Sequence, residues 1–215
     1  GGGNEIVRNL LFNTCRESGD HGPFNSWDRV PYITTLRNGT ASIVPAPRQI
    51  DHNFIIANYN SEGAIDTDDG SAYYRVVDNF FAYGANGLKS DFGGHDNNFT
   101  RNVLAYAGEC FGTPMPFRYF KGYNNVFVDN ACIALSSTGT GAGPYSSDCY
   151  LDQSWTVKRN RVYTSTGNAT ICGKPWAEWF SRNSSSRDVG STIAKWPADA
   201  ELVAWASRLL NFTVG

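Results

Sequence analysis

Acidic residues gather in one short stretch of the chain, and paired acids are the groups that hydrolyse glycosidic bonds. Asp66, Asp68 and Asp69 fall within four consecutive positions. Glycoside hydrolysis needs two carboxyl groups, one protonated to assist the leaving group and one ionised to activate water or attack carbon. Neighbouring acids favour opposite protonation states, which produces that division of roles. We therefore expect Asp68 and Asp69 to be the catalytic pair, with Asp28 as an alternative base or nucleophile.

Other polar and aromatic residues could complete a sugar-binding site around these acids. His95 would orient or tune the acidic pair. Aromatic rings offer a flat apolar face to a sugar ring, and charged side chains bind its hydroxyl or carboxyl groups. The predicted substrate-binding residues are Asp20, His21, Trp27, Arg29, Asp91, Phe92, Arg118 and Lys121.

The acidic stretch also allows two other interpretations. Carboxylate oxygens are ligands that Ca²⁺ prefers, so Asp66, Asp68 and Asp69 could hold a calcium ion. Calcium dependence would favour a polysaccharide lyase, which needs a base beside a metal-neutralised carboxylate. Asp is also an ordinary turn former that solvent simply hydrates. We expect a hydrolase without a cofactor, and keep calcium as the alternative.

A recurring Asn followed by a short apolar run predicts how these residues are positioned. The Asn residues are Asn9, Asn53, Asn79, Asn102, Asn125 and Asn160. Two of the intervals are 23 residues, a length typical of one coil of a solenoid. A leucine-rich repeat would need a Leu framework that the sequence lacks, so the pattern favours a parallel β-helix. We expect each Asn to adopt left-handed backbone angles at a bend and to hydrogen-bond to the Asn of the next coil.

A second bend, rich in polar residues, follows about ten residues after several of these Asn residues. Its copies span residues 19–29, 63–71, 87–96 and 117–121. Because equivalent positions of successive coils stack, these bends would lie on one side of the solenoid. The candidate residues would then line one lateral groove.

The sequence predicts an all-β chain in three parts. Residues 1–165 would form a parallel β-helix of about six turns, and residues 166–196 a loop-rich segment that packs on it. Residues 197–211 read as an amphipathic helix, with a Pro start, acids in the first turn and Arg in the last. We expect this helix to cap the solenoid.

The Asn-punctuated repeat resembles the right-handed parallel β-helix of the pectin-lyase-like superfamily, which includes many carbohydrate-active enzymes. The resemblance covers roughly residues 4–165. Polygalacturonase-type hydrolases in that superfamily carry an adjacent Asp pair, a Gly-His-Gly on the following turn and an Arg-x-Lys on the one after. The residues that follow this order here are Asp68-Asp69, Gly94-His95, and Arg118 with Lys121. Asp96 replaces the second Gly, and two residues separate Arg from Lys. The resemblance implies a β-helix glycoside hydrolase acting on a polysaccharide.

Cysteines and glycosylation motifs indicate an oxidising compartment. The five Cys residues show no metal-binding spacing. Cys110 and Cys132 are 22 residues apart, and Cys149 and Cys172 are 23 apart, so each pair is predicted to form a disulfide, with Cys15 unpaired or bonded to another chain. Five free thiols are the alternative. Glycosylation motifs occur at Asn38, Asn98, Asn168, Asn183 and Asn211, which favours secretion.

Composition argues against nucleic-acid binding and against a membrane span. With 18 Lys and Arg against 20 Asp and Glu, the net charge of −2 provides no basic surplus for nucleic acid. No apolar run reaches the 18 residues that would predict a membrane span.

The chain begins Gly1-Gly2-Gly3-Asn4, without an initiator Met or a signal-peptide pattern. We expect a C-terminal fragment, whose open first coil is covered by the rest of the protein or by another chain. Such a fragment could instead be a non-catalytic structural or carbohydrate-binding subunit of an extracellular fibre or coat.

Overall fold

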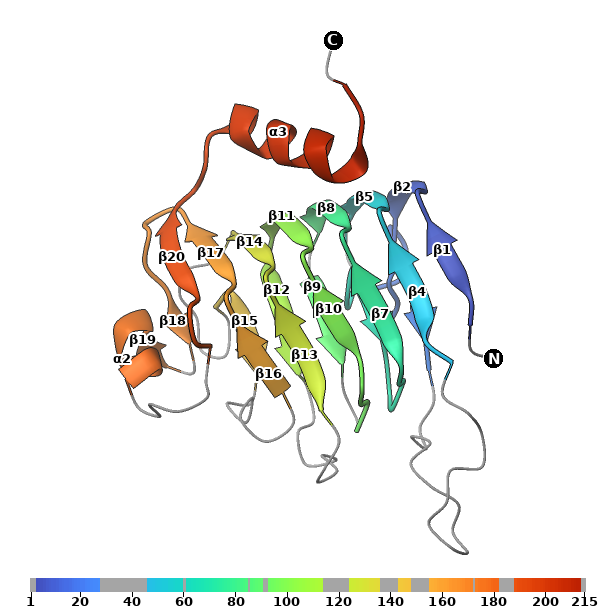
Figure 1. Cartoon of the computed structure of the whole chain (residues 1–215), viewed down its shortest axis with the longest axis horizontal. Coiled ribbons are helices and arrows are strands. Elements are labelled where there is room, and N and C mark those ends of the chain that lie inside the picture. The colour runs from blue at the N-terminus through green and yellow to red at the C-terminus, as the bar shows by residue number, and fades with distance from the viewer. Residues whose placement is uncertain are drawn as a thin grey trace, which may run out of the picture.

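Three parallel sheets surround a shared core, in a β-helix-like arrangement (Figure 1). The computed structural model describes residues 3–27, 46–59, 61–84, 86–90, 93–113, 124–135, 143–147, 155–171, 173–181 and 188–213. Successive strands enter the sheets, here named A, B and C, in turn, so each coil adds one strand to each sheet. The predicted all-β chain of stacked parallel strands is confirmed.

Each strand is short, as expected where a turn follows every few residues. Sheet A contains β1 (Glu5–Val7), β4 (Arg48–Asp51), β7 (Tyr74–Val77), β10 (Asn98–Thr100), β13 (Asn125–Val128) and β16 (Trp155–Lys158). Sheet B contains β2 (Leu10–Thr14), β5 (Phe54–Asn58), β8 (Phe80–Gly84), β11 (Val103–Ala107), β14 (Ala131–Ala134), β17 (Arg161–Thr164) and β20 (Thr192–Lys195). Sheet C contains β3 (Asn25–Ser26), β6 (Ile65–Thr67), β9 (Asn86–Ser90), β12 (Glu109–Thr113) and β15 (Tyr145–Ser147).

Apolar side chains from all three sheets fill the interior. Ile50, Val76 and Phe99 occupy equivalent positions on neighbouring strands of sheet A, and each is at most 2% exposed. Side chains alternate along a strand, so a strand of three or four residues points one or two of them inward. These inward residues stack from coil to coil and fill the interior. Aromatic rings pack at the C-terminal coils, with ring centroids 4.7 Å apart for Phe111 and Phe127.

Stacked Asn side chains form a ladder where sheet A turns into sheet B, and all but the exposed first one are buried. Its members are Asn9, Asn53, Asn79, Asn102, Asn130 and Asn160. At each step the backbone N–H and the Nδ2 of one Asn donate to Oδ1 of the next, both at 3.0 Å between Asn79 and Asn102. Nδ2 of Asn102 also donates to the Val76 carbonyl at 2.8 Å. The ladder thereby satisfies the polar groups of a turn that is closed to water.

Two details of the predicted ladder are wrong. Asn125 begins β13 in sheet A and belongs to a second ladder, where its Oδ1 accepts the Asn97 N–H at 3.0 Å. The sequence Asn125-Val126-Phe127 resembles the repeat, and its ladder position is taken by Asn130. Left-handed backbone angles occur at the residue before each ladder Asn, at Arg8, His52, Asp78, Arg101, Asp129 and Arg159, with φ between 51° and 60°.

The stack extends beyond residue 165, into the segment expected to be loop-rich. There Ser191 replaces the ladder Asn and accepts the Asn160 N–H at 2.7 Å, and β20 pairs with β17. Gly190 supplies the preceding left-handed residue, with φ 79°. The same segment holds β18 (Thr170–Ile171), β19 (Lys174–Pro175) and α2 (Trp176–Ser181). The Asn repeat does not reveal this coil, because Ser and Gly replace its residue types.

The C-terminal helix α3 (Asp199–Leu210) lies along the outer face of sheet B (Figure 1). Its buried residues Leu202, Trp205 and Ala206 join a cluster with Phe80 and Ile133 of that sheet. The helix agrees closely with the predicted range, and Asn211 ends it in a left-handed conformation. It covers a side of the stack, whereas a capping helix would lie over an open end. Among the described residues, no helix has the length and apolar character needed to span a membrane.

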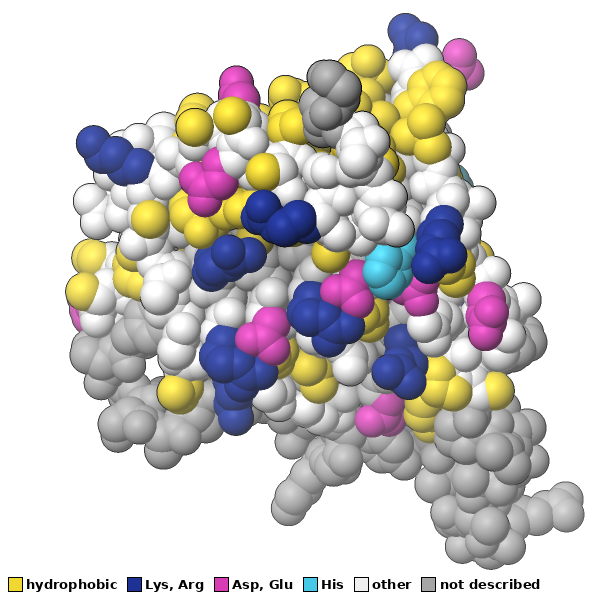
Figure 2. All heavy atoms as spheres, turned by 45° about the horizontal axis from the view of Figure 1, so that its top comes forward, with side chains coloured by type: hydrophobic (Ala, Val, Ile, Leu, Met, Phe, Trp, Pro, Cys, Tyr) yellow, Lys and Arg dark blue, Asp and Glu magenta, His cyan; other side chains and the backbone are white. Residues whose placement is uncertain are grey.

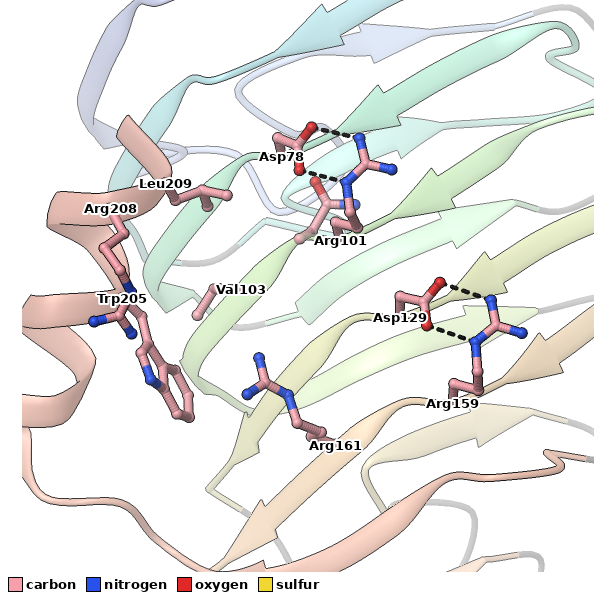
Figure 3. A pocket seen from close by; sticks show the side chains of 10 residues that line it. Asp78, Arg101, Val103, Asp129, Arg159, Arg161, Trp205, Arg208 and Leu209 are labelled. Carbon is pink, nitrogen blue, oxygen red and sulfur yellow. Dashed lines mark hydrogen bonds and ion pairs between the residues drawn. The ribbon is translucent and has the colours of Figure 1, made fainter. Parts of the chain in front are cut away.

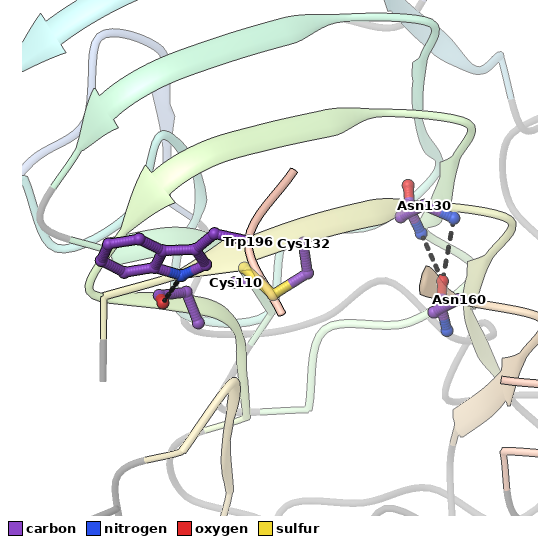
Figure 4. Close-up of a disulfide and its surroundings, with 6 residues drawn as sticks. Cys110, Asn130, Cys132, Asn160 and Trp196 are labelled. Carbon is purple, nitrogen blue, oxygen red and sulfur yellow. Dashed lines mark hydrogen bonds between the residues drawn. A yellow bond between two sulfur atoms is a disulfide. The ribbon is translucent and has the colours of Figure 1, made fainter. Parts of the chain in front are cut away.

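One predicted disulfide is confirmed. Cys110 in β12 and Cys132 in β14 are bonded in the core, with Cα atoms 5.7 Å apart (Figure 4). The predicted pair Cys149 and Cys172 lies outside the described residues. Cys15 is half-buried and has no disulfide partner among the described residues, and its Sγ donates to the His21 carbonyl at 3.3 Å.

The ladder predicts a specific loss of stability. Asn102→Ala removes the acceptor of two Asn79 donors, and each orphaned buried group costs about 1–3 kcal/mol. We expect the free energy of unfolding to fall by about 3 kcal/mol in urea titrations. The exposed Asn124, which hydrogen-bonds to Thr156, provides the control as Asn124→Ala, for which we expect a loss under about 1 kcal/mol. Equal losses in the two variants would contradict the role of the ladder.

The ladder ends beside a buried acid that makes stability depend on pH. Asp188 is 1% exposed, and burial raises its pKa to about 6, although hydrogen bonds from Ser191, Asn160 and Tyr145 partly oppose the shift. This folded-state pKa lies above the ordinary value of 3.8. The unfolded chain therefore ionises first, so the contribution of Asp188 to stability is present below pH 4 and is lost as pH rises through about 6.

Asp188→Asn should remove this pH dependence. Relative to the wild type, the variant should gain up to about 3 kcal/mol of unfolding free energy between pH 4 and pH 7. Urea unfolding at a series of pH values measures this gain, with the exposed Asp20→Asn as control. A variant whose stability parallels that of the wild type over this range would contradict the assignment.

Candidate functional site

Three acids surround one lysine on the outer face of sheet C. Lys89 Nζ lies 3.1 Å from Glu62 Oε1, 3.1 Å from Asp66 Oδ1 and 3.2 Å from Asp68 Oδ1. Ile65 and Leu88, the neighbours of Asp66 and Lys89 in sequence, belong to the core. Because side chains alternate along a strand, Asp66 and Lys89 point away from the core. We name these four charged residues the Lys89 cluster.

The register of sheet C brings the cluster together. Asp66 in β6 lies directly opposite Lys89 in β9 and opposite Asn25 in β3. Asn25 Nδ2 donates to Asp66 Oδ2 at 2.9 Å, so both oxygens of Asp66 face a polar partner from an adjacent coil. A shift of one residue in this register would move Asp66 and Lys89 toward the core.

Burial differs sharply among the members of the cluster. The side chains of Asp66 and Lys89 are 0% and 4% exposed, whereas those of Asp68 and Glu62 are 19% and 40% exposed. Burial raises the pKa of Asp66, and the charge and hydrogen bond of Lys89 offset part of that shift. The buried pair thus sets the electrostatics of the site, while Asp68 and Glu62 reach solvent.

An exposed tryptophan lies beside the acidic pair. Trp27 is 59% exposed, and its Nε1–H donates to Asp69 Oδ2 at 3.0 Å. The Asp69 backbone N–H donates to Asp68 Oδ1 at 2.9 Å, and the Asp68 N–H donates to the Ser26 carbonyl at 2.9 Å. The structure therefore brings together Trp27, Asp68 and Asp69, three of the predicted site residues.

His95 occupies the next coil of the same corner, between sheets C and A. It is 2% exposed, its Nδ1 lies 2.8 Å from Asp96 Oδ2, and its ring packs edge-on against Tyr73 with centroids 5.3 Å apart. The Tyr73 N–H donates to the His95 carbonyl at 3.2 Å. These contacts fix His95 within the corner, and its predicted action on the acidic pair stays a prediction.

The remaining predicted substrate-binding and glycosylation residues lie partly in the described chain and partly outside it. Asp20 and His21 are exposed before β3, and the Asp20 N–H donates to Ser18 Oγ at 3.4 Å. Of the glycosylation motifs, Asn168 and Asn211 are exposed and Asn98 is half-buried in β10. The predicted residues that lie outside the described part of the chain are Asp28, Arg29, Asp91, Phe92, Arg118, Lys121, Asn38 and Asn183.

Lys89 and Glu62 were absent from the predicted site, although the sequence carries a signal for Lys89. Asp66 and Lys89 are 23 residues apart, the same interval that separates Asn79 from Asn102. Aligning Ile65-Asp66-Thr67 with Leu88-Lys89-Ser90 would have placed the two charges side by side. No comparable interval identifies Glu62.

Comparison of the chain with protein-family models, with curated protein sequences and with solved structures gave no match. In the described parts of the chain, no group of three or more His, Cys, Asp and Glu side chains is arranged to hold a metal ion. Two of the three predicted calcium ligands, Asp66 and Asp68, contact the Lys89 ammonium instead. A calcium ion at Asp66, Asp68 and Asp69 stays a prediction.

Removing Lys89 should destabilise the fold, because Asp66 is then buried without a cation. Lys89→Met leaves Asp66 buried without its cation, and we expect a loss of about 3–5 kcal/mol in unfolding free energy at pH 7. The loss should shrink as the pH falls, because the raised pKa of Asp66 favours its uptake of a proton in the folded state.

The double variant Lys89→Met/Asp66→Asn should recover most of this stability, because no buried charge is left unpaired. Lys174→Met, at a partly exposed lysine paired with Glu178, is the matched control. Urea unfolding at pH 4 and pH 7 measures both effects. A Lys89→Met variant that is equally destabilised at the two pH values would contradict the ion pair.

Proposed function

We propose that the chain is a secreted glycoside hydrolase built on a right-handed parallel β-helix of about six turns, similar to the pectin-lyase-like superfamily. Its polysaccharide substrate would lie beside sheet C, across Trp27, Asp69 and Asp68. The observation that carries this proposal is the exposed indole of Trp27 hydrogen-bonded to the carboxylate of Asp69. The buried Cys110–Cys132 disulfide supports an oxidising compartment.

Aromatic and acidic groups side by side suit a sugar ring. The indole face packs against the C–H groups of the ring, and the adjacent carboxylate accepts hydrogen bonds from its hydroxyls. Trp27 is held in place by its bond to Asp69, so this surface is ordered before a ligand arrives.

The contacts suggest how the two acids would divide the reaction. Asp68 faces the Lys89 ammonium, which suits it to the role that needs a negative charge, the base or nucleophile. Asp69 accepts the indole N–H through Oδ2 and would act as the general acid, with the proton for the leaving oxygen carried on Oδ1. Asp66 and Lys89 would act by positioning, because neither side chain reaches solvent.

A second function is favoured by the N-terminal end of the stack. Within the described residues β1, β2 and β3 are edge strands of their three sheets. An edge strand carries backbone groups that can pair with a further strand. A non-catalytic subunit of an extracellular fibre or coat, which binds carbohydrate through Trp27, is therefore the alternative.

Activity on polysaccharides separates the two functions. We expect the wild-type chain to release reducing ends from at least one member of a panel of neutral and acidic polysaccharides. Asp69→Asn and Asp68→Asn should each lower the rate about 100-fold or more while leaving the fold intact. Trp27→Ala should weaken binding to the same polysaccharide in pull-down assays, by about tenfold.

Glu201→Gln, at an exposed acid in the first turn of α3, is the control and should leave the rate unchanged. Binding without cleavage would favour the structural alternative. A chain that neither binds nor cleaves any polysaccharide would contradict both functions.

A further inference from the structure

A second surface feature lies where α3 meets the ridge between sheets A and B. It is formed by other residues than the acids beside sheet C. A groove of about 580 Å³ runs between the helix and the left-handed residues that precede the ladder Asn side chains. Figure 3 shows two ion pairs on the ridge side of this groove and Trp205 and Arg208 on the helix side. We name it the ridge groove.

The groove is positively charged in a chain that carries a net charge of −2. Four arginines and two aspartates line it: Arg101, Arg159, Arg161, Arg208, Asp78 and Asp129. Figure 2 shows basic side chains gathered among acidic ones on the face that carries the helix. The excess of two positive charges is therefore local to this groove.

Two of the arginines are already neutralised. Arg101 Nε and Nη2 donate to the two oxygens of Asp78 at 2.8 and 2.6 Å, and Arg159 makes the same contacts to Asp129 at 2.8 and 2.7 Å. These bidentate pairs raise the pKa of both guanidinium groups and lower that of Asp129. They form a rigid wall along the ridge and contribute little net charge.

The other two arginines carry the excess charge. Arg161 and Arg208 form no ion pair with an acid in the described part of the chain, and the Arg161 guanidinium lies 4.8 Å from the centre of the Trp205 ring. A positive charge in the last turn of α3 is favoured by the helix dipole, which explains Arg208 without a ligand. The dipole does not explain Arg161.

Arg161 stands in a column of sheet B that is otherwise apolar over five coils. The residues paired in register before it are Leu10, Phe54, Phe80, Val103 and Ala131. An apolar residue at this position would extend the surface that α3 covers. The guanidinium instead packs against the Trp205 ring and lines the ridge groove, where its N–H donors are available.

We propose that the ridge groove binds an acidic oligosaccharide, with the carboxylate or sulfate of a sugar held between Arg161 and Arg208. Guanidinium forks match such oxyanions bidentately, and the volume lies in the range of organic ligand sites, well above that of a lone ion. The carboxylates of Asp78 and Asp129 line the other wall and accept hydrogen bonds from sugar hydroxyls. This site is separate from the one proposed at Trp27.

Calorimetric titration of the whole chain with matched trisaccharides tests the proposal. Trigalacturonate and sulfated maltotriose carry the two oxyanions, maltotriose is the neutral trisaccharide, and inorganic phosphate is the free ion. We expect an acidic trisaccharide to bind and maltotriose and phosphate to bind at least about tenfold more weakly. The tighter of the two acidic trisaccharides identifies the oxyanion.

Variants locate the binding. Arg208→Gln and the double variant Arg161→Gln/Arg208→Gln should weaken it about tenfold or more, while Arg75→Gln, at an exposed arginine of β7, should leave it unchanged. Because Arg161 packs on Trp205, circular dichroism confirms that the double variant is folded, and the single Arg208→Gln variant tests the groove without that contact. Calorimetry measures this binding without any cleavage, so failure of this proposal and failure of the proposed hydrolase are distinguishable.

Three results would overturn the proposal. They are phosphate binding as tightly as the acidic trisaccharides, an Arg75→Gln effect equal to that of Arg208→Gln, or no binding of either acidic trisaccharide.

Discussion

The hydrogen bonds of the Asn ladder are the interaction on which the rest of the structure depends. A parallel stack must turn sharply between sheets at every coil, and each turn would bury backbone donors without partners. The ladder satisfies them with one side-chain oxygen per coil, which accepts two bonds from the previous coil. Since each Asn bonds to the next, the ladder also fixes the offset between neighbouring coils. Side chains on the outer faces consequently align.

That alignment produces the charged features of the surface. On sheet C it places the buried Asp66 against Lys89, and these two hold Asp68 beside the exposed Trp27 and Asp69. On the ridge it places Asp78 beside Arg101 and Asp129 beside Arg159. Arg101 lies one coil from both Asp78 and Asp129 and pairs with Asp78, while Asp129 pairs with Arg159. Both proposed binding surfaces are therefore consequences of one stacking rule applied at different corners of the coil.

The sequence was informative where the repeat is regular and misleading where residue types change. The interval of 23 residues between Asn79 and Asn102 predicted stacked parallel strands, since a polar bend that recurs at this interval is typical of a solenoid. Asn125 was misplaced because a strand of sheet A begins with Asn, although every ladder Asn follows Arg, His or Asp, as Asn130 follows Asp129 and Asn125 does not. Ser191 hid the last coil of sheet B, although its hydroxyl accepts the same backbone bond as an Asn amide would. For the site, the acids were visible as a cluster, but Lys89 was not, because its contacts with Asp66 and Asp68 come from the next coil.

Hydrogen exchange measured residue by residue tests the ladder most directly. If the ladder holds the coils in register, the backbone amides of Asn79, Asn102 and Asn130 exchange only through global unfolding, at the rate set by the stability of the whole chain. The amides of Asp66 and Lys89, which the same register positions, should exchange with them. Ladder amides that exchange as fast as those of exposed turns, while strands of the core stay protected, would contradict the account.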